Sequence, residues 1–103
     1  MKKKLVLCVC LLVVATSASA SVCIEMAKVA KLIMEVRQSG ASIVDQLEAV
    51  DKAKTETGMN DIYKAIVYDA YERPFFVSPE AKRLSANKFE TDVYLMCKEK
   101  WED

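Results

Sequence analysis

Apolar residues recur every three to four positions along most of the chain after residue 20, which is the spacing of an amphipathic helix. No stretch alternates between apolar and polar residues for long enough to predict a strand. Glycine and proline are scarce, with two of each at Gly40, Gly58, Pro74 and Pro79. Glycine is favoured just past the end of a helix, and proline ends one helix or opens the next. The pattern therefore predicts an all-α fold, a small bundle of about four helices.

The first two predicted helices cover residues 22–39 and 43–57. The first helix carries an apolar stripe expected to face the core: Cys23, Met26, Ala27, Ala30, Ile33 and Met34. Its polar positions are expected to remain exposed: Lys28, Lys31, Glu35 and Gln38. Ser42 is the expected N-cap of the second helix, which has only a thin apolar stripe formed by Ile43, Leu47 and Val50. The second helix should therefore be the most weakly packed.

The third predicted helix covers residues 61–72, with Asn60 as its cap, and Pro74 should end it at or before Arg73. Most of its circumference is apolar: Ile62, Ala65, Ile66 and Ala70, widened by Tyr63, Val67 and Tyr71. Such a helix usually lies at the centre of a bundle. The fourth predicted helix covers residues 79–101 and follows Ser78 as its N-cap. Its expected buried side consists of Ala81, Leu84, Phe89, Val93, Met96 and Cys97.

The N-terminal segment has the layout of a secretory signal peptide. Three lysines at residues 2–4 precede an apolar run at residues 5–15, and small residues fill positions 18–20. We therefore expect residues 1–20 to be cleaved, which leaves residues 21–103 as one helical domain. The apolar run is shorter than the roughly 20 residues that a membrane-spanning helix needs. This shortness disfavours the alternative of an uncleaved N-terminal anchor, and no transmembrane anchor is expected elsewhere.

The four cysteines divide into two pairs. Cys8 and Cys10 lie in the predicted signal peptide, so only Cys23 and Cys97 remain in the exported chain. In an oxidising compartment these two can pair, which would place the first and last helices side by side. A disulfide that closes the loop from residue 23 to residue 97 should contribute about 4.5 kcal/mol to the free energy of unfolding, in the chain-entropy treatment of disulfides. The sequence thus predicts an exported protein with one long-range disulfide, located in the periplasm or secreted.

Charge and missing residue types exclude several functions. The chain has 15 basic and 15 acidic residues, and the predicted signal peptide holds three of the basic ones, so the remainder carries a net charge of −3. This charge argues against nucleic acid as a partner and suits a basic partner better. Histidine is absent, which removes the commonest general base and metal ligand. The paired carboxylates, Glu90 with Asp92 and Asp69 with Glu72, are interpreted as solvated helix faces. We expect no enzymatic activity, no metal site and no cofactor.

An aromatic segment between the third and fourth helices is the best candidate for binding. Tyr71, Arg73, Phe75 and Phe76 lie close together in the sequence around Pro74. Arginine and aromatic side chains are enriched at the energetic centres of protein interfaces. These four residues are therefore the candidate partner-binding residues. The alternative is that one or both phenylalanines plug the open end of the bundle.

Three short segments resemble those of small exported helical proteins of proteobacteria and their phages: residues 37–40 (RQSG), 70–74 (AYERP) and 89–97 (FETDVYLMC). The resemblance implies a bacterial or phage origin. In general plan, with a signal peptide, helices and one long-range disulfide, the chain is also similar to HdeA-like periplasmic acid chaperones and to Spackle-like phage inhibitors that block a lysozyme domain.

The leading functional hypothesis is a non-catalytic binding module or inhibitor that docks on another exported protein. A cell-wall or lytic enzyme is one candidate target. The first alternative is an acid-stress chaperone, whose trigger would have to be carboxylates that titrate near pH 4. The second is a secreted, effector-type factor. The partner and the oligomeric state stay open at this stage.

Overall fold

The computed structural model describes residues 22–53 and 58–101, and within these ranges it contains four helices and no strand. The first helix covers residues 22–38. It is followed by α2 (Ile43–Lys52), α3 (Met59–Glu72) and α4 (Pro79–Trp101). The predicted all-α class and the order of the helices are confirmed. The predicted signal peptide lies outside the described residues.

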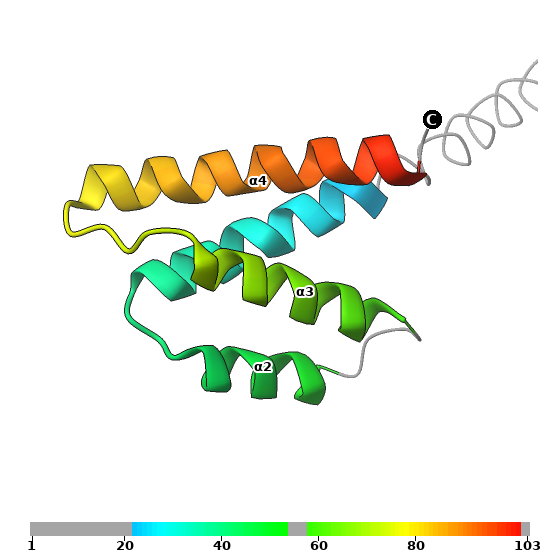
Figure 1. The fold of residues 1–103 in the computed structure, drawn as a ribbon, viewed down its shortest axis with the longest axis horizontal. Helices are drawn as coiled ribbons and strands as arrows, with labels where there is room; N and C mark the ends of the chain where they lie inside the picture. The colour runs from blue at the N-terminus through cyan, green and yellow to red at the C-terminus, as the bar shows by residue number, and fades with distance from the viewer. Residues whose placement is uncertain (1–21, 54–57, 102–103) are drawn as a thin grey trace, which may run out of the picture.

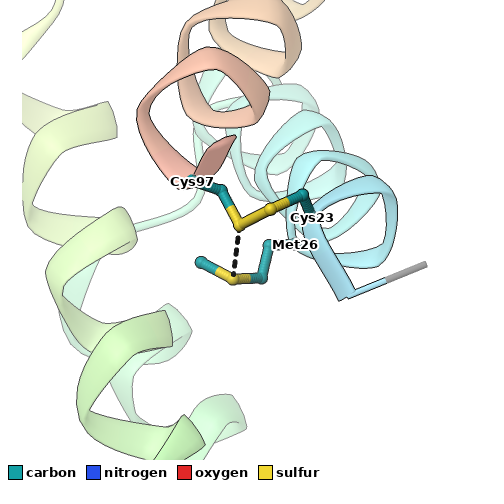
Figure 2. Close-up of a disulfide and its surroundings, with 3 residues drawn as sticks. All are labelled: Cys23, Met26 and Cys97. Carbon is teal, nitrogen blue, oxygen red and sulfur yellow. Dashed lines mark hydrogen bonds between the residues drawn. A yellow bond between two sulfur atoms is a disulfide. The ribbon is translucent and has the colours of Figure 1, made fainter. Parts of the chain in front are cut away.

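The first helix and α4 run side by side, and α3 lies between this pair and α2 (Figure 1). A disulfide joins Cys23 to Cys97 with their Cα atoms 5.5 Å apart, which confirms the predicted pairing. Figure 2 shows Met26 beneath this bond, with its Sδ atom 3.7 Å from Cys97 Sγ. We describe this contact as packing between sulfur atoms, because an oxidised cysteine has no S–H to donate. No helix in the described part of the chain is long and apolar enough to cross a membrane.

Residues from the first helix, α3 and α4 form the core. The buried apolar residues comprise Cys23, Met26, Ala27, Ala30, Ile33, Met34, Tyr63, Ile66, Val67, Ala70, Ala86, Phe89, Val93 and Cys97. The predicted stripe of the first helix is buried throughout. The partly buried residues of α2, Ile43, Leu47 and Val50, pack against this core from one side.

Most predicted helix boundaries are correct. Ser42 Oγ accepts a hydrogen bond from the backbone N–H of Asp45 at 3.0 Å, and Ser78 Oγ accepts one from Ala81 at 3.1 Å. Gly40 follows the first helix with φ at 103°, a conformation that L side chains rarely adopt. Pro74 stands two residues after the last residue of α3. Local sequence signals therefore set these boundaries.

Two predicted boundaries are wrong or untested. Asn60 is not the cap of α3, because this helix begins two residues earlier than predicted, at Met59, and Gly58 occupies the N-cap position with φ at 91°. The described part of α2 ends at Lys52, and the predicted end at Thr57 lies outside the described residues.

Several predicted faces need correction. Leu84 and Met96 are 53% and 48% exposed, whereas Ala86 is fully buried. The buried line of α4 runs through Ala86, Phe89, Val93 and Cys97. Leu84 precedes Ala86 by two residues, which is about 200° of helical rotation, so it points away from the core. On α3, Ala65 is exposed, whereas Tyr63, which was also predicted to lie on the apolar side, is buried.

Gln38 corrects the prediction for the polar positions of the first helix. We expected this residue to be exposed, but its side chain is 2% exposed. Gln46 of α2 is also buried. Buried amide groups are costly unless they form hydrogen bonds, so both residues require partners. Their partners lie at the end of the bundle opposite the disulfide.

Candidate functional site

Residues 73–78 connect α3 to α4, and we call this segment the connector. Gln38 reaches it from the end of the first helix. Its Nε2 donates to the carbonyl of Pro74 at 2.8 Å, and its Oε1 accepts from the backbone N–H of Phe76 at 2.9 Å. Nε2 also lies 3.5 Å from Met34 Sδ. The side-chain amide therefore pairs with the connector as a second peptide group would. This pairing holds the connector in one conformation.

Arg37 holds the start of the connector. Its Nη2 donates to the carbonyl of Arg73 at 3.2 Å. Its guanidinium carbon lies 4.8 Å from the ring centroid of Tyr71 and 5.5 Å from that of Phe75, within the range of cation–π attraction. Its Nε is buried and has no hydrogen-bond partner. Arg37 thus brings a positive charge against two of the predicted aromatic residues.

The side chain of Arg73 turns toward α4 instead of projecting into solvent. Its Nη1 donates to Asp92 at 2.7 Å, its Nε lies 3.5 Å from Asp69, and its guanidinium lies 4.5 Å from the Phe89 ring centroid. Lys88 forms a second ion pair with Asp92 at 3.1 Å. Arg73 therefore ties the connector to the bundle. If the connector binds a partner, Arg73 contributes mainly by holding the connector in place.

These contacts shift the pKa values of the two charged partners. The hydrogen bond from Arg73 is the largest effect on Asp92 and lowers its pKa, and Lys88 lowers it further. Burial by itself lowers the pKa of Arg73, but hydrogen bonds and attraction to Asp92 and Asp69 outweigh it and raise the pKa. Both groups remain charged at neutral pH. The ion pairs therefore persist across the ordinary pH range.

The hydroxyl of Tyr71 is also used within the structure. It donates to the carbonyl of Ala41 at 2.6 Å and accepts from Gln46 Nε2 at 3.2 Å. The same Nε2 lies 2.9 Å from the carbonyl of Ile33. Sequence reasoning missed Gln46, since nothing in the polar pattern of α2 distinguishes it from its exposed neighbours. Together these bonds fasten the start of α2 to the bundle.

Phe75 and Phe76 differ in exposure. Phe75 is 48% exposed, whereas Phe76 is half-buried. Lys82 Nζ lies 4.0 Å from the Phe75 ring centroid and donates to the backbone carbonyl of Gln38. Of the four predicted residues, Phe75 is thus the aromatic that presents its ring to solvent. The ring stands on a segment fixed by Gln38, Arg37 and Arg73.

A groove of about 430 Å³ lies beside the connector. It is lined by Arg73, Pro74, Phe76, Ala81, Leu84, Ser85 and Lys88. Sequence reasoning placed Leu84 in the core, so its contribution to this groove was missed. A count of helical rotation from the buried line of α4 would have identified it. The groove extends the apolar surface from the connector onto the first turns of α4.

A second groove, of about 330 Å³, lies near the disulfide and includes Ile62, Met96 and Lys100 in its lining. Figure 2 shows the region around the disulfide, where the labelled side chains are those of cysteine and methionine. None of the four predicted binding residues lines this second groove. The connector is therefore the place where the predicted residues, an exposed aromatic ring and an apolar groove coincide.

The polar groups around the connector form a supporting framework. Within the described ranges, no three histidine, cysteine, aspartate or glutamate residues gather closely enough to hold a metal ion. Asp69 and Asp92, from two pairs of carboxylates noted in the sequence, both contact Arg73. The connector and its groove therefore present an apolar surface flanked by positive charges, which is suited to binding.

The comparisons with known proteins add no relative. No family model, curated protein or solved structure matches the chain. The resemblance to HdeA-like and Spackle-like proteins accordingly stays a prediction.

Proposed function

We propose that this protein is a small exported binding module or inhibitor that docks on another exported protein through the connector. The docking surface, which we call the connector surface, comprises Pro74, Phe75, Phe76 and Leu84. The observation that carries the proposal is the half-exposed ring of Phe75 on a connector that Gln38 fixes from beneath.

A fixed segment favours binding because it loses little conformational freedom when a partner docks. Association normally costs free energy for every loop and side chain that becomes ordered. Here Gln38, Arg37 and Arg73 already order the connector through their hydrogen bonds. Aromatic anchors in such rigid surroundings are typical of the energetic centres of interfaces.

The predicted signal peptide and the Cys23–Cys97 disulfide support a location outside the cytoplasm, either in the periplasm or in the medium. A partner in the same compartment is the simplest expectation. A cell-wall or lytic enzyme is one candidate. We propose no catalysis, because the polar groups of the connector are occupied in holding it.

The test is affinity capture with matched variants. The exported protein, purified with its disulfide intact, is immobilised and exposed to periplasmic extract and to phage lysate. We expect one dominant partner, with affinity reduced at least about tenfold in Phe75→Ala and also reduced in Leu84→Ala. Val44→Ala is the matched control, since Val44 is 60% exposed on α2, away from the connector. Equal capture by all four proteins would exclude the connector surface.

The acid-stress chaperone is the second candidate, and one observation favours it. The Arg73–Asp92 pair ties the connector to α4, so protonation of Asp92 would loosen the groove beside it. Because the pKa of Asp92 is lowered, this change requires strongly acidic conditions. Dye binding and protection of client proteins from aggregation, measured from about pH 2 to pH 5, test the idea. No acid-induced dye binding and no protection would remove this candidate.

A secreted, effector-type factor is compatible with the same export signal. Fractionation that finds the protein in the culture medium and not in the periplasm would favour that role.

A further inference from the structure

We propose that the connector surface recognises an acidic segment of its protein partner, with partner carboxylates contacting Arg37 and Lys82 beside the Phe75 ring. This inference rests on the proposed docking function and specifies the chemistry of the docked surface. It follows from where positive charge is left uncompensated.

Arg37 and Lys82 differ from the four basic residues that form ion pairs. Lys64, Arg73, Arg83 and Lys88 each form an ion pair with a carboxylate. In the described part of the chain, neither Arg37 nor Lys82 forms an ion pair with a carboxylate. Their hydrogen bonds go to backbone carbonyls, of Arg73 and of Gln38 respectively. A carbonyl carries no net charge, so two positive charges remain unmatched.

The two cations converge on one exposed ring. The Arg37 guanidinium lies 5.5 Å and Lys82 Nζ 4.0 Å from the centroid of Phe75. Both side chains are half-buried, which holds their charges close to the ring and limits their freedom. A partner that packs an apolar group on Phe75 would bring neighbouring carboxylates within reach of both. Partner carboxylates would supply the counter-charge that the described residues of the chain do not.

The local charge beside Phe75 is positive, whereas the expected net charge of the exported chain is negative. The exported chain is expected to be acidic overall, which by itself suits a basic partner. The two charged groups that contact the Phe75 ring, Arg37 and Lys82, are both positive. Local complementarity sets which group docks at a contact, because charges in water are screened beyond about 10 Å at 0.1 M salt. The docked segment should therefore be acidic.

The test is an amide-resonance titration of the isotopically labelled exported protein with hexaglutamate, using hexaglutamine as the neutral probe. We expect shifts confined to residues 37, 75 and 82 with hexaglutamate, lost at high salt, and none with hexaglutamine. Lys82→Met keeps an apolar stem over Phe75 and removes the charge. This change should weaken hexaglutamate binding about two- to fivefold, the range measured for exposed ion pairs.

Arg83→Met is the matched control, because Arg83 is the next residue on the same helix and its side chain is 61% exposed. It removes the same charge from the same end of the molecule and should leave hexaglutamate binding unchanged. Equal weakening by both variants would show general attraction to a basic region and overturn the proposal. Equal shifts with inorganic phosphate would indicate a small-anion site and would also overturn it.

The capture experiment separates this inference from the docking function. Partner capture that depends on Phe75 but is unchanged in Lys82→Met at both low and high salt would leave the docking function standing and overturn the acidic segment. Retention of further copies of this chain as the dominant species would identify self-association and would likewise overturn it. Loss of affinity in Lys82→Met, with Arg83→Met unchanged, supports the inference.

Discussion

The first helix and α4 are held together differently at their two ends. At one end, the Cys23–Cys97 disulfide joins them directly, and Met26 packs against the bond (Figure 2). At the other end, Lys82 of α4 donates to the backbone carbonyl of Gln38, whose side-chain amide donates to the carbonyl of Pro74 in the connector. At the covalent end, the link between the two helices is a bond between side chains and not a set of hydrogen bonds to the connector.

This difference bears on where a binding surface can be built. Hydrogen bonds to the connector fix a segment that still presents an exposed phenylalanine. The disulfide instead removes conformational freedom from the unfolded chain as a whole. We infer that the covalent end supplies general stability, while the polar end positions the connector surface. Four predictions test this division, in order of decreasing effect on stability.

The largest effect should come from the covalent end. Replacing both Cys23 and Cys97 with serine should lower the free energy of unfolding by about 4 kcal/mol, because the disulfide closes a loop with a sequence separation of 74 residues. Urea unfolding of the oxidised protein and the double variant measures this difference. A loss below about 1 kcal/mol would show that packing alone holds this end.

The second prediction concerns the polar end. Gln38→Met retains side-chain volume but removes both hydrogen bonds to the connector. This variant should lower the free energy of unfolding by about 2–3 kcal/mol, because the N–H of Phe76 and the carbonyl of Pro74 lose their hydrogen-bond partner. Urea unfolding measures this loss of stability, and amide hydrogen exchange at Phe76 should become faster in the same variant.

Ser39→Ala serves as the control for Gln38→Met, because Ser39 is the next residue and is exposed. It should change stability by no more than about 0.5 kcal/mol. If exchange at Phe76 is equally slow in Gln38→Met, the connector is fixed by other contacts and the proposed division fails.

The helices could be predicted because their signals are local in the sequence. The disulfide could be predicted because few cysteines were available to pair. Caps such as Ser42 and Ser78 act within three residues, and only two cysteines remained to pair. Gln38 was missed because its partners, Pro74 and Phe76, lie 36 and 38 residues away. A signal did exist, since Gln38 continues the buried stripe four residues beyond Met34. The polarity of Gln38 predicts exposure, whereas its helical spacing from Met34 indicates burial.

The candidate surface was predictable only in part. Adjacent aromatic residues marked the connector, but the sequence could not show which ring is exposed, because this depends on contacts with distant residues of the first helix, Arg37 and Gln38. Leu84 was assigned to the core because it is apolar. Its exposure follows from its angular distance from the buried line of α4, which the predicted core residues Phe89, Val93 and Cys97 already define.

The third prediction is a moderate, pH-dependent effect. The lowered pKa of Asp92 means that its contribution to stability is fully present above its unfolded value, about pH 4, and is lost as pH falls through the lowered folded value. Asp92→Asn should therefore cost about 1 kcal/mol at pH 7, because these ion pairs are only partly shielded from solvent.

Urea unfolding at about pH 7 and pH 3 measures this prediction. The difference between wild type and Asp92→Asn should shrink at the lower pH, because the Asp92 carboxylate is then largely protonated in the unfolded chain, which stabilises that state. Glu48→Gln is the control, since Glu48 is exposed on α2, away from the Arg73 network. An equal cost of Asp92→Asn at both values would mean that its ion pairs do not stabilise the fold.

The smallest effect on stability should come from Phe75, although its effect on binding should be large. Phe75→Ala removes a half-exposed ring and its contacts with Arg37 and Lys82, which should cost about 0.5 kcal/mol. Phe75→Leu should restore stability but not partner binding, if the flat ring is what the partner contacts. Thermal unfolding and partner affinity, measured on the same preparations, separate the two roles. A loss of 2 kcal/mol or more in Phe75→Ala would instead make Phe75 part of the core, and the exposed aromatic could no longer serve as the anchor of a binding surface.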